Sequence, residues 1–190
     1  YIIKNDFDVA LKFLQKSFDV RKIAYIDTPN HPHIAYSLNS LGSFYDKIGD
    51  FDKAIEYYEE SYMMRRNYHS NNIYHIDIAL ILNNIGYAYS KDSQKKDFGK
   101  AIQYLEDSLK ILEFLYENNY NHPYIIYLLY CKGEVYERIG NLEKALEFYQ
   151  KSHDNAINAY RNNKNHPTVI NSHNKINIVK QKILNSSINY

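Results

Sequence analysis

The sequence predicts an all-α fold, a solenoid of antiparallel helix pairs with a period of about 44 residues. The first observation is a set of aligned glycines spaced 44 and then 47 residues apart: Gly42, Gly86 and Gly133. The second is a set of histidines spaced 44, 47 and 44 residues apart: His31, His75, His122 and His166. A repeat of this length is typical of stacked helix pairs that share one core.

The first helix of each repeat is expected to begin directly after this histidine. Proline at the first helical position loses no hydrogen bond, and it follows three of the four histidines, as in Pro32. Glycine is expected to end the helix, at Gly49–Asp50 and at Gly140–Asn141. Between these limits the apolar residues of one repeat recur at helical spacing: Ile34, Leu38, Leu41 and Tyr45.

This register divides the chain into repeats 29–72, 73–119 and 120–163. The three extra residues of the middle repeat lie in the segment from Ser90 to Lys96. The second helix of a repeat carries small residues such as Ala54 and Ser61, where it must approach the first helix closely. Gly42 and its equivalents are expected to have the same role on the first helix.

The two ends of the chain are expected to differ from a complete repeat. In the repeat register Tyr1 is equivalent to Tyr45, so residues 1–28 are expected to start in the last turn of a preceding helix. We therefore expect a fragment of a longer array. Residues 164–190 predict a single terminal helix that caps the solenoid. Its apolar stripe is narrow: Val169, Ile176, Val179 and Ile183.

Three short motifs define the repeat more narrowly. Repeat 29–72 opens with His31-Pro32, continues as Ala35-Tyr36-Ser37-Leu38-Asn39-Ser40-Leu41 and closes as Ser61-Tyr62-Met63-Met64-Arg65. This pattern resembles the tetratricopeptide repeat, and in particular the kinesin-light-chain-like subtype. The resemblance implies a right-handed superhelix that binds proteins without catalysis. Lys132 departs from the pattern, because leucine is usual at its position.

The resemblance also implies which positions face the concave groove. They are Tyr36, Asn39, Ser43 and Asp46; Leu80, Asn83, Asn84, Tyr87 and Ser90; Tyr127, Tyr130, Glu134 and Glu137; and Asn171, Asn174, Ile178 and Gln181. Asn39, Asn83 and Asn174 recur at one position, where side-chain amides can hold an extended peptide backbone. Tyrosines between them would supply apolar contact. The alternative is that asparagine is simply common, at 22 of 190 residues.

Charge is balanced overall but uneven along the chain. The net charge of +1 argues against a chain-wide basic surface, so we expect no nucleic-acid partner. From Asn155 to Tyr190 there are five basic residues and no acidic one. This segment is either a solvated cap or a dock for an acidic partner. One basic residue also recurs near the end of each first helix, where it is expected to stabilise the helix dipole: Lys47, Lys91, Arg138 and Lys182.

No motif predicts catalysis, a cofactor or a metal. The four repeated histidines are expected to lie one repeat apart, too far for one ion, and they are interpreted as helix caps. There is no nucleophile elbow and no glycine-rich phosphate loop. The single cysteine, Cys131, fits a reducing compartment, and we expect no membrane insertion.

The favoured function is an adaptor or scaffold that binds a peptide or a partner helix in its concave groove. Two alternatives stay open: a purely structural subunit of a cytoskeletal or ciliary assembly, and a ligand-sensing regulatory arm of a signalling ATPase. The expected location is the cytoplasm. The resemblance to the kinesin-light-chain-like subtype also implies an association with the cytoskeleton or a cilium as an option. Some members of the family that the repeat resembles bind a C-terminal carboxylate with a clamp of lysine, asparagine and arginine side chains on three helices. Only the Asn83/Asn84 element of such a clamp is present, so binding of this kind is disfavoured.

Overall fold

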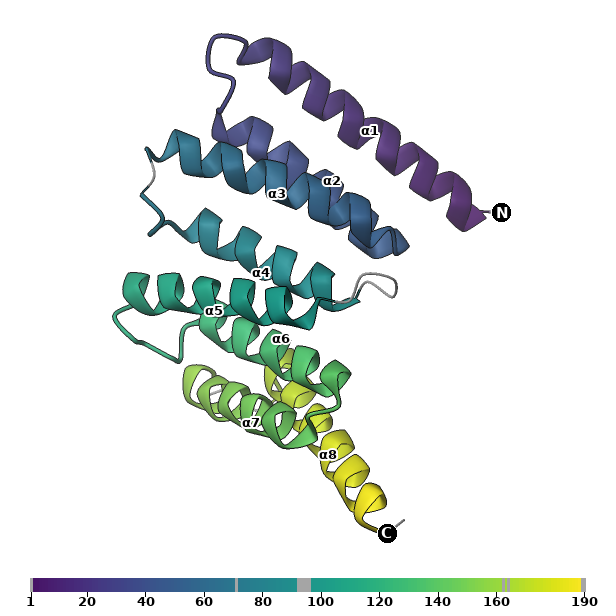
Figure 1. The fold of residues 1–190 in the computed structure, drawn as a ribbon, viewed down its shortest axis with the longest axis vertical. Helices are drawn as coiled ribbons and strands as arrows, with labels where there is room; N and C mark the ends of the chain where they lie inside the picture. Colours follow the sequence, from purple (N-terminus) through teal and green to yellow (C-terminus); the bar gives the residue numbers. More distant parts are fainter. Residues whose placement is uncertain (1, 71, 92–96, 162, 164, 189–190) are drawn as a thin grey trace. The chain divides into compact units, whose positions relative to one another are not determined.

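The computed structural model describes residues 2–70, 72–91, 97–161, 163 and 165–188. All regular secondary structure in these residues is α-helical, in agreement with the predicted all-α class (Figure 1). The chain divides into two compact units, residues 1–96 and 97–190, and each is described by itself. Unit 1 contains α1 (Ile2–Ala24), α2 (Pro32–Ile48), α3 (Phe51–Tyr68) and α4 (Ile76–Lys91). Unit 2 contains α5 (Phe98–Leu115), α6 (Pro123–Ile139), α7 (Leu142–Ala159) and α8 (Pro167–Ile188).

The helix pair α2/α3 is joined by a two-residue turn. Gly49 ends α2 with φ of 86°, a left-handed conformation that glycine adopts without a side-chain clash. Asp50 then caps α3, and its carboxylate accepts the backbone N–H of Lys53 at 3.2 Å. In unit 2 the same turn joins α6 to α7 through Gly140 and Asn141. The helix breaks predicted at both glycines are confirmed.

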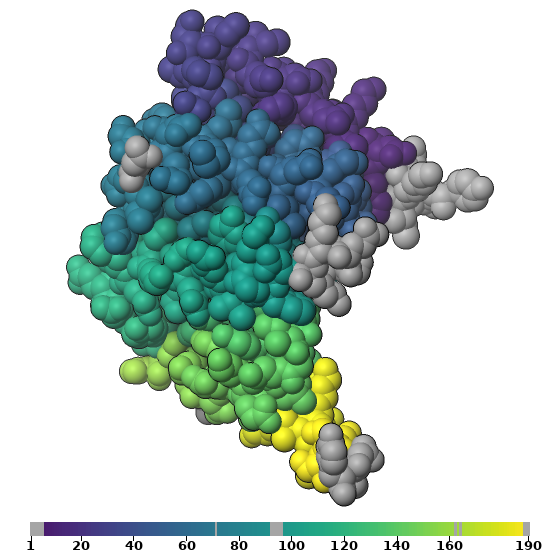
Figure 2. Space-filling view, in the orientation of Figure 1, coloured from purple at the N-terminus to yellow at the C-terminus, as the bar shows by residue number. Residues whose placement is uncertain are grey.

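Two further glycines, Gly42 on α2 and Gly133 on α6, allow the paired helices to touch. A Cβ atom on Gly42 would lie 2.6 Å from Cδ1 of Tyr58, and one on Gly133 would lie 2.7 Å from Cδ1 of Tyr149. Both distances are shorter than van der Waals contact, so a Cβ atom at either position would force the tyrosine ring or the helices to shift. Side chains fill the space between the paired ribbons of each unit (Figure 2).

A buried serine joins the paired helices at the same level of both units. The hydroxyl of Ser61 on α3 donates to the carbonyl of Ala35 on α2 at 2.6 Å. The hydroxyl of Ser152 on α7 donates to the carbonyl of Ile126 on α6 at 2.9 Å. A larger side chain would hold the helices apart, so the prediction of small residues at the helix contact is confirmed for Ser61.

Each first helix begins at a histidine that both caps and stacks. The Nδ1 atom of His31, His75, His122 and His166 accepts the backbone N–H two residues later, at 3.2 to 3.3 Å. Each imidazole also stacks on a ring six residues earlier, with centroid distances of 3.6, 3.9, 3.4 and 3.7 Å: Tyr25, His69, Tyr116 and Tyr160. The interpretation of the repeated histidines as helix caps is therefore confirmed.

The segments at the edges of the repeats differ in how far the structure describes them. Tyr1, expected at the end of a preceding helix, lies outside the described residues, and from Ile2 the chain is one continuous helix to Ala24. Most of the insertion expected between Ser90 and Lys96 also lies outside them. The stripe predicted on α8 is found as expected, because Val169, Ile176 and Val179 are buried.

Candidate functional site

The predicted groove residues of unit 1 lie on α2 and α4, and two side-chain bridges join these helices. The Asn84 amide donates to Oδ1 of Asn39 at 3.1 Å. The ammonium group of Lys91 contacts both carboxylate oxygens of Asp46 at 2.9 and 3.1 Å, and it lies 4.3 Å from the centroid of the Tyr87 ring. We call this surface the α2/α4 face: Tyr36, Asn39, Ser43, Asp46, Leu80, Asn84, Tyr87 and Lys91.

The side chains of the α2/α4 face differ in exposure. Tyr36 is 55% exposed, and the guanidinium of Arg21 lies 5.5 Å from the centroid of its ring. Asn39, Ser43, Leu80, Asn84 and Tyr87 are partly exposed. Tyr36 is thus the large aromatic side chain of this face that is most open to a ligand.

Asn83 differs from the expectation of an asparagine ladder. Its side chain is only 4% exposed, and its Oδ1 has no hydrogen-bond partner among the described residues. Asn39, its equivalent on α2, is engaged with Asn84 instead. A peptide on the surface would reach Asn83 only after neighbouring side chains moved, so Asn83 is not a direct contact in this conformation.

The corresponding surface of unit 2 lies on α6 and α8. Glu134 and Glu137 on α6 face Lys175 on α8, with nitrogen–oxygen distances of 3.4 and 3.1 Å, and Lys182 contacts Glu137 at 2.7 Å. Tyr127 is 52% exposed. We call this surface the α6/α8 face: Tyr127, Tyr130, Glu134, Glu137, Asn171, Asn174, Lys175 and Lys182.

The remaining predicted residues of the α6/α8 face divide by exposure. Asn171 and Asn174 are exposed on α8. Tyr130 is partly buried, with its ring centroid 5.4 Å from that of Tyr149, and burial raises its pKa to about 12. Its hydroxyl therefore stays protonated at neutral pH. Tyr127 is the exposed aromatic side chain of this face, at the repeat position that Tyr36 occupies in unit 1.

The carboxylate of Glu137 accepts hydrogen bonds from three side chains of unit 2. Burial alone would raise its pKa, but hydrogen bonds from Lys182, Tyr149 and Lys175 outweigh burial and lower it to about 2. The carboxylate is therefore ionised at neutral pH, and it holds α6, α7 and α8 together through these three partners.

These bridges change the interpretation of the repeated basic residues. Lys91 and Lys182 were expected to stabilise helix dipoles, but they reach back to an acidic residue 45 positions earlier, Asp46 and Glu137 respectively. Two of the five basic residues after Asn155, Lys175 and Lys182, are paired in this way. Part of the basic surplus of that segment is therefore balanced by acidic residues within unit 2.

The sequence contains a signal for these bridges that the repeat spacing alone does not reveal. Asp46 and Glu137 are acidic residues near the end of a first helix. In the following repeat, the residue one position after the equivalent of each is basic: Lys91 and Lys182. Asn39 and Asn84 have the same offset. Pairs separated by one repeat plus one residue thus mark contacts between consecutive first helices.

The comparisons with known proteins agree with the repeat register. Two tetratricopeptide-repeat family models match residues 1–67 and 126–154, which together make up just over half of the chain. The chain belongs to the tetratricopeptide-repeat family. Repeats of this family mediate protein–protein interactions, and the fold is typically non-catalytic. A search of curated protein sequences finds no match.

Solved structures match this tetratricopeptide-repeat protein over nearly its whole length. BtubC (BKLC) from P. vanneervenii aligns with a TM-score of 0.69 at 17% identity, covering 95% of this chain and 72% of that chain. A putative kinesin light chain from Podosopora anserina, with nearly identical repeats, gives 0.69 at 17% identity, covering 95% and 81%. A single-residue variant of that second protein gives 0.70 at 17% identity, covering 95% and 80%. The kinesin-light-chain-like repeat fold is therefore confirmed. No helix in the described part of the chain is long and apolar enough to cross a membrane.

Proposed function

We propose that this chain is a non-catalytic adaptor module that binds an extended peptide or a partner helix on its first helices. The observation that carries the proposal is the exposure of Tyr36 and Tyr127, at 55% and 52%. They occupy the same repeat position, on helices whose apolar residues are otherwise largely buried. A large aromatic side chain left in solvent at a repeated position is typical of a binding surface.

The bridges beside these tyrosines favour binding by preorganisation. On the α2/α4 face the Asn39–Asn84 and Asp46–Lys91 contacts fix polar side chains before any ligand arrives. On the α6/α8 face Glu137 has the same effect on Lys175 and Lys182. Side chains that are already ordered lose less conformational entropy on binding, so a larger part of the contact energy contributes to affinity.

Site-specific photo-crosslinking tests the proposed faces. A benzophenone amino acid is placed at position 36 or 127, and Tyr120 provides a matched control. Tyr120 is 43% exposed and lies in the loop before α6. We expect a shared crosslinked protein at positions 36 and 127 that is absent at position 120. Equal crosslinking at all three positions, or none at 36 and 127, would contradict the proposal and favour the purely structural role.

The cellular setting is a further part of the proposal. From the tetratricopeptide-repeat type we infer a cytoplasmic adaptor whose partner is a protein. A regulatory arm of an ATPase would bind its ligand on the same faces. The two roles are separated by the crosslinked species, since an adaptor would capture a macromolecule and a sensing arm a small ligand.

A further inference from the structure

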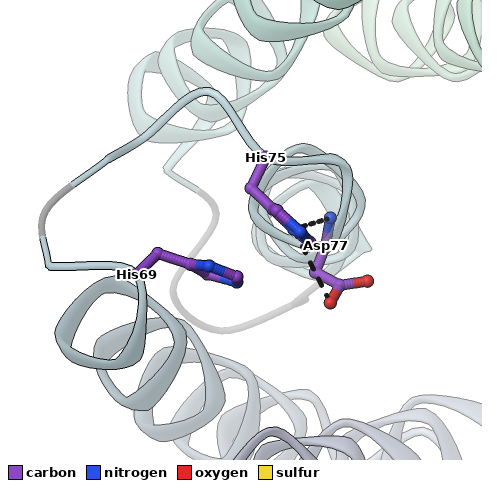
Figure 3. A group of neighbouring side chains, drawn as sticks. All are labelled: His69, His75 and Asp77. Atoms are coloured by element: carbon purple, nitrogen blue, oxygen red, sulfur yellow. Dashed lines mark hydrogen bonds and ion pairs between the residues drawn. The ribbon is translucent and has the colours of Figure 1, made fainter.

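One of the four histidine caps differs from the others in chemistry. Three capping imidazoles stack on a tyrosine, but His75 stacks on His69, which ends α3 (Figure 3). The residue that donates its N–H to the cap is also unusual here, because it is Asp77. The equivalent residues of the other caps are His33, Tyr124 and Thr168. Two imidazoles and a carboxylate therefore meet at this cap.

We propose that His69, His75 and Asp77 form a binding site for a divalent transition-metal ion of the zinc class. One ligand atom from each of the three residues lies within 4.8 Å of the other two. Imidazole nitrogen and carboxylate oxygen are donors that Zn²⁺, Co²⁺ and Ni²⁺ accept, and water would complete a four-coordinate site.

The distance between two of the ligand atoms is already close to that of a metal chelate. Nδ1 of His75 lies 3.7 Å from Oδ2 of Asp77. Two ligands of a tetrahedral zinc ion with bonds of about 2.1 Å are about 3.4 Å apart. The ion would take the lone pair that now accepts the backbone N–H of Asp77 at 3.2 Å, so its binding replaces one long capping bond.

An unpaired atom of His69 supports the metal site separately from the ligand distances. Its Nε2 atom is buried and has no hydrogen-bond partner among the described residues. Buried polar atoms are normally paired, and an isolated one in a native fold calls for an explanation such as a bound ion. Figure 3 shows the His69 ring directed toward His75 and Asp77. An ion between the three side chains would give Nε2 its partner.

Arg65 is the fourth side chain at this site, and its positive charge has two effects. Its guanidinium is almost fully buried and forms an ion pair with Asp77. This contact orients the carboxylate, as outer partners of metal ligands commonly do. Its positive charge also opposes a cation, so we expect reversible binding at micromolar metal rather than a permanent structural ion.

A titration of the untagged, metal-free chain with Zn²⁺ tests the proposal. The matched variant is His69→Tyr, which installs the residue that the other three caps use and should therefore fold. The control is His173→Tyr, which removes a histidine of α8 outside the cluster, 5.5 Å from the ring of His153. Calorimetry gives the stoichiometry, and the visible absorption of added Co²⁺ reports the coordination geometry.

We expect the natural sequence and His173→Tyr to bind one Zn²⁺ per chain, and His69→Tyr to bind it at least roughly tenfold more weakly. At the same Zn²⁺ concentration, the Tm of the first two proteins should rise more than that of His69→Tyr. Equal binding by His69→Tyr, absence of binding in the natural sequence, or a loss confined to His173→Tyr would overturn the proposal. Each readout is independent of a protein partner, so it can fail while the proposed function stands.

Discussion

A single carboxylate, Glu137, connects three helices of unit 2. Its oxygens accept hydrogen bonds from Tyr149 on α7 at 2.8 Å and from Lys175 and Lys182 on α8 at 3.1 and 2.7 Å. Glu134 lies beside it and contacts Lys175 as well. Because these donors hold the pKa of Glu137 at about 2, the folded state prefers the ionised carboxylate.

The stability of unit 2 should therefore depend on pH through Glu137. Its folded pKa of about 2 lies below the ordinary value of 4.5, so its contribution is complete above about pH 4.5. That contribution is lost as the pH falls from about 4.5 toward 2. Denaturant unfolding between pH 6 and pH 3 should show a smaller loss of stability for Glu137→Gln than for the natural sequence. Parallel pH profiles for the two proteins would show that Glu137 does not provide this linkage.

The capping histidines provide a second prediction for single residues. His122→Ala removes the bond from Nδ1 to the Tyr124 N–H and the stacking on Tyr116. We expect a loss of about 1 to 3 kcal/mol in the free energy of unfolding. His122→Asn can still accept the capping bond and should lose less. If thermal unfolding shows equal losses for the two variants, the capping bond contributes nothing beyond the stack.

Among the elements, the pair α6/α7 depends on a glycine. Gly133→Ala would place a Cβ atom 2.7 Å from the ring of Tyr149, which is fully buried and cannot move aside freely. Overpacking of this kind costs about 1 to 3 kcal/mol, while alanine gains about 1 kcal/mol in helix propensity. We expect a net loss of stability in chemical denaturation.

The control for this substitution is Gly99→Ala, in the first turn of α5. The nearest atom to its Cβ would be Oδ1 of Asp97 at 3.3 Å, on an exposed surface. The higher helix propensity of alanine should dominate there, and stability should stay the same or rise by up to about 1 kcal/mol. Stabilisation by Gly133→Ala to the same degree would mean that α6 and α7 do not require the close approach.

The helix pairs could be predicted from the sequence because their signals recur at fixed spacing. Glycine at Gly49 and Gly140 and histidine at the helix starts each have one local physical role. The bridges between repeats could not be predicted in the same way. They join Asn39 to Asn84 and Asp46 to Lys91, an offset that depends on how consecutive helices are rotated when they stack.

The candidate site was predicted less completely than the fold, because the exposure of each side chain also depends on how consecutive helices are rotated when they stack. Tyr36 and Tyr127 are exposed as a groove position requires, whereas Asn83 is buried although its equivalent Asn39 is partly exposed. A shared repeat position therefore does not guarantee a shared environment. His69 occupies a repeat position that is tyrosine in the other repeats, at Tyr25, Tyr116 and Tyr160. The sequence does not show that this position stacks on the capping histidine, so the contact of His69 with His75 could not be predicted.

For the whole molecule, the structure favours recognition through localised contacts over attraction between extended charges. The net charge is +1, and two basic residues of the C-terminal segment, Lys175 and Lys182, are paired with acidic residues within unit 2. Exposed tyrosines on preorganised faces provide most of their binding energy over a short range. The affinity of a partner should therefore depend weakly on salt and strongly on these two side chains.

The direct test is the affinity of the protein captured at positions 36 and 127, measured by calorimetry with the purified chain. Tyr36→Ala combined with Tyr127→Ala should weaken binding by roughly tenfold or more, since truncation of an aromatic anchor typically costs over 1 kcal/mol. Tyr120→Ala should leave the affinity unchanged. Unaltered binding by the double variant, with both proteins equally helical, would contradict a role for the first helices in partner recognition.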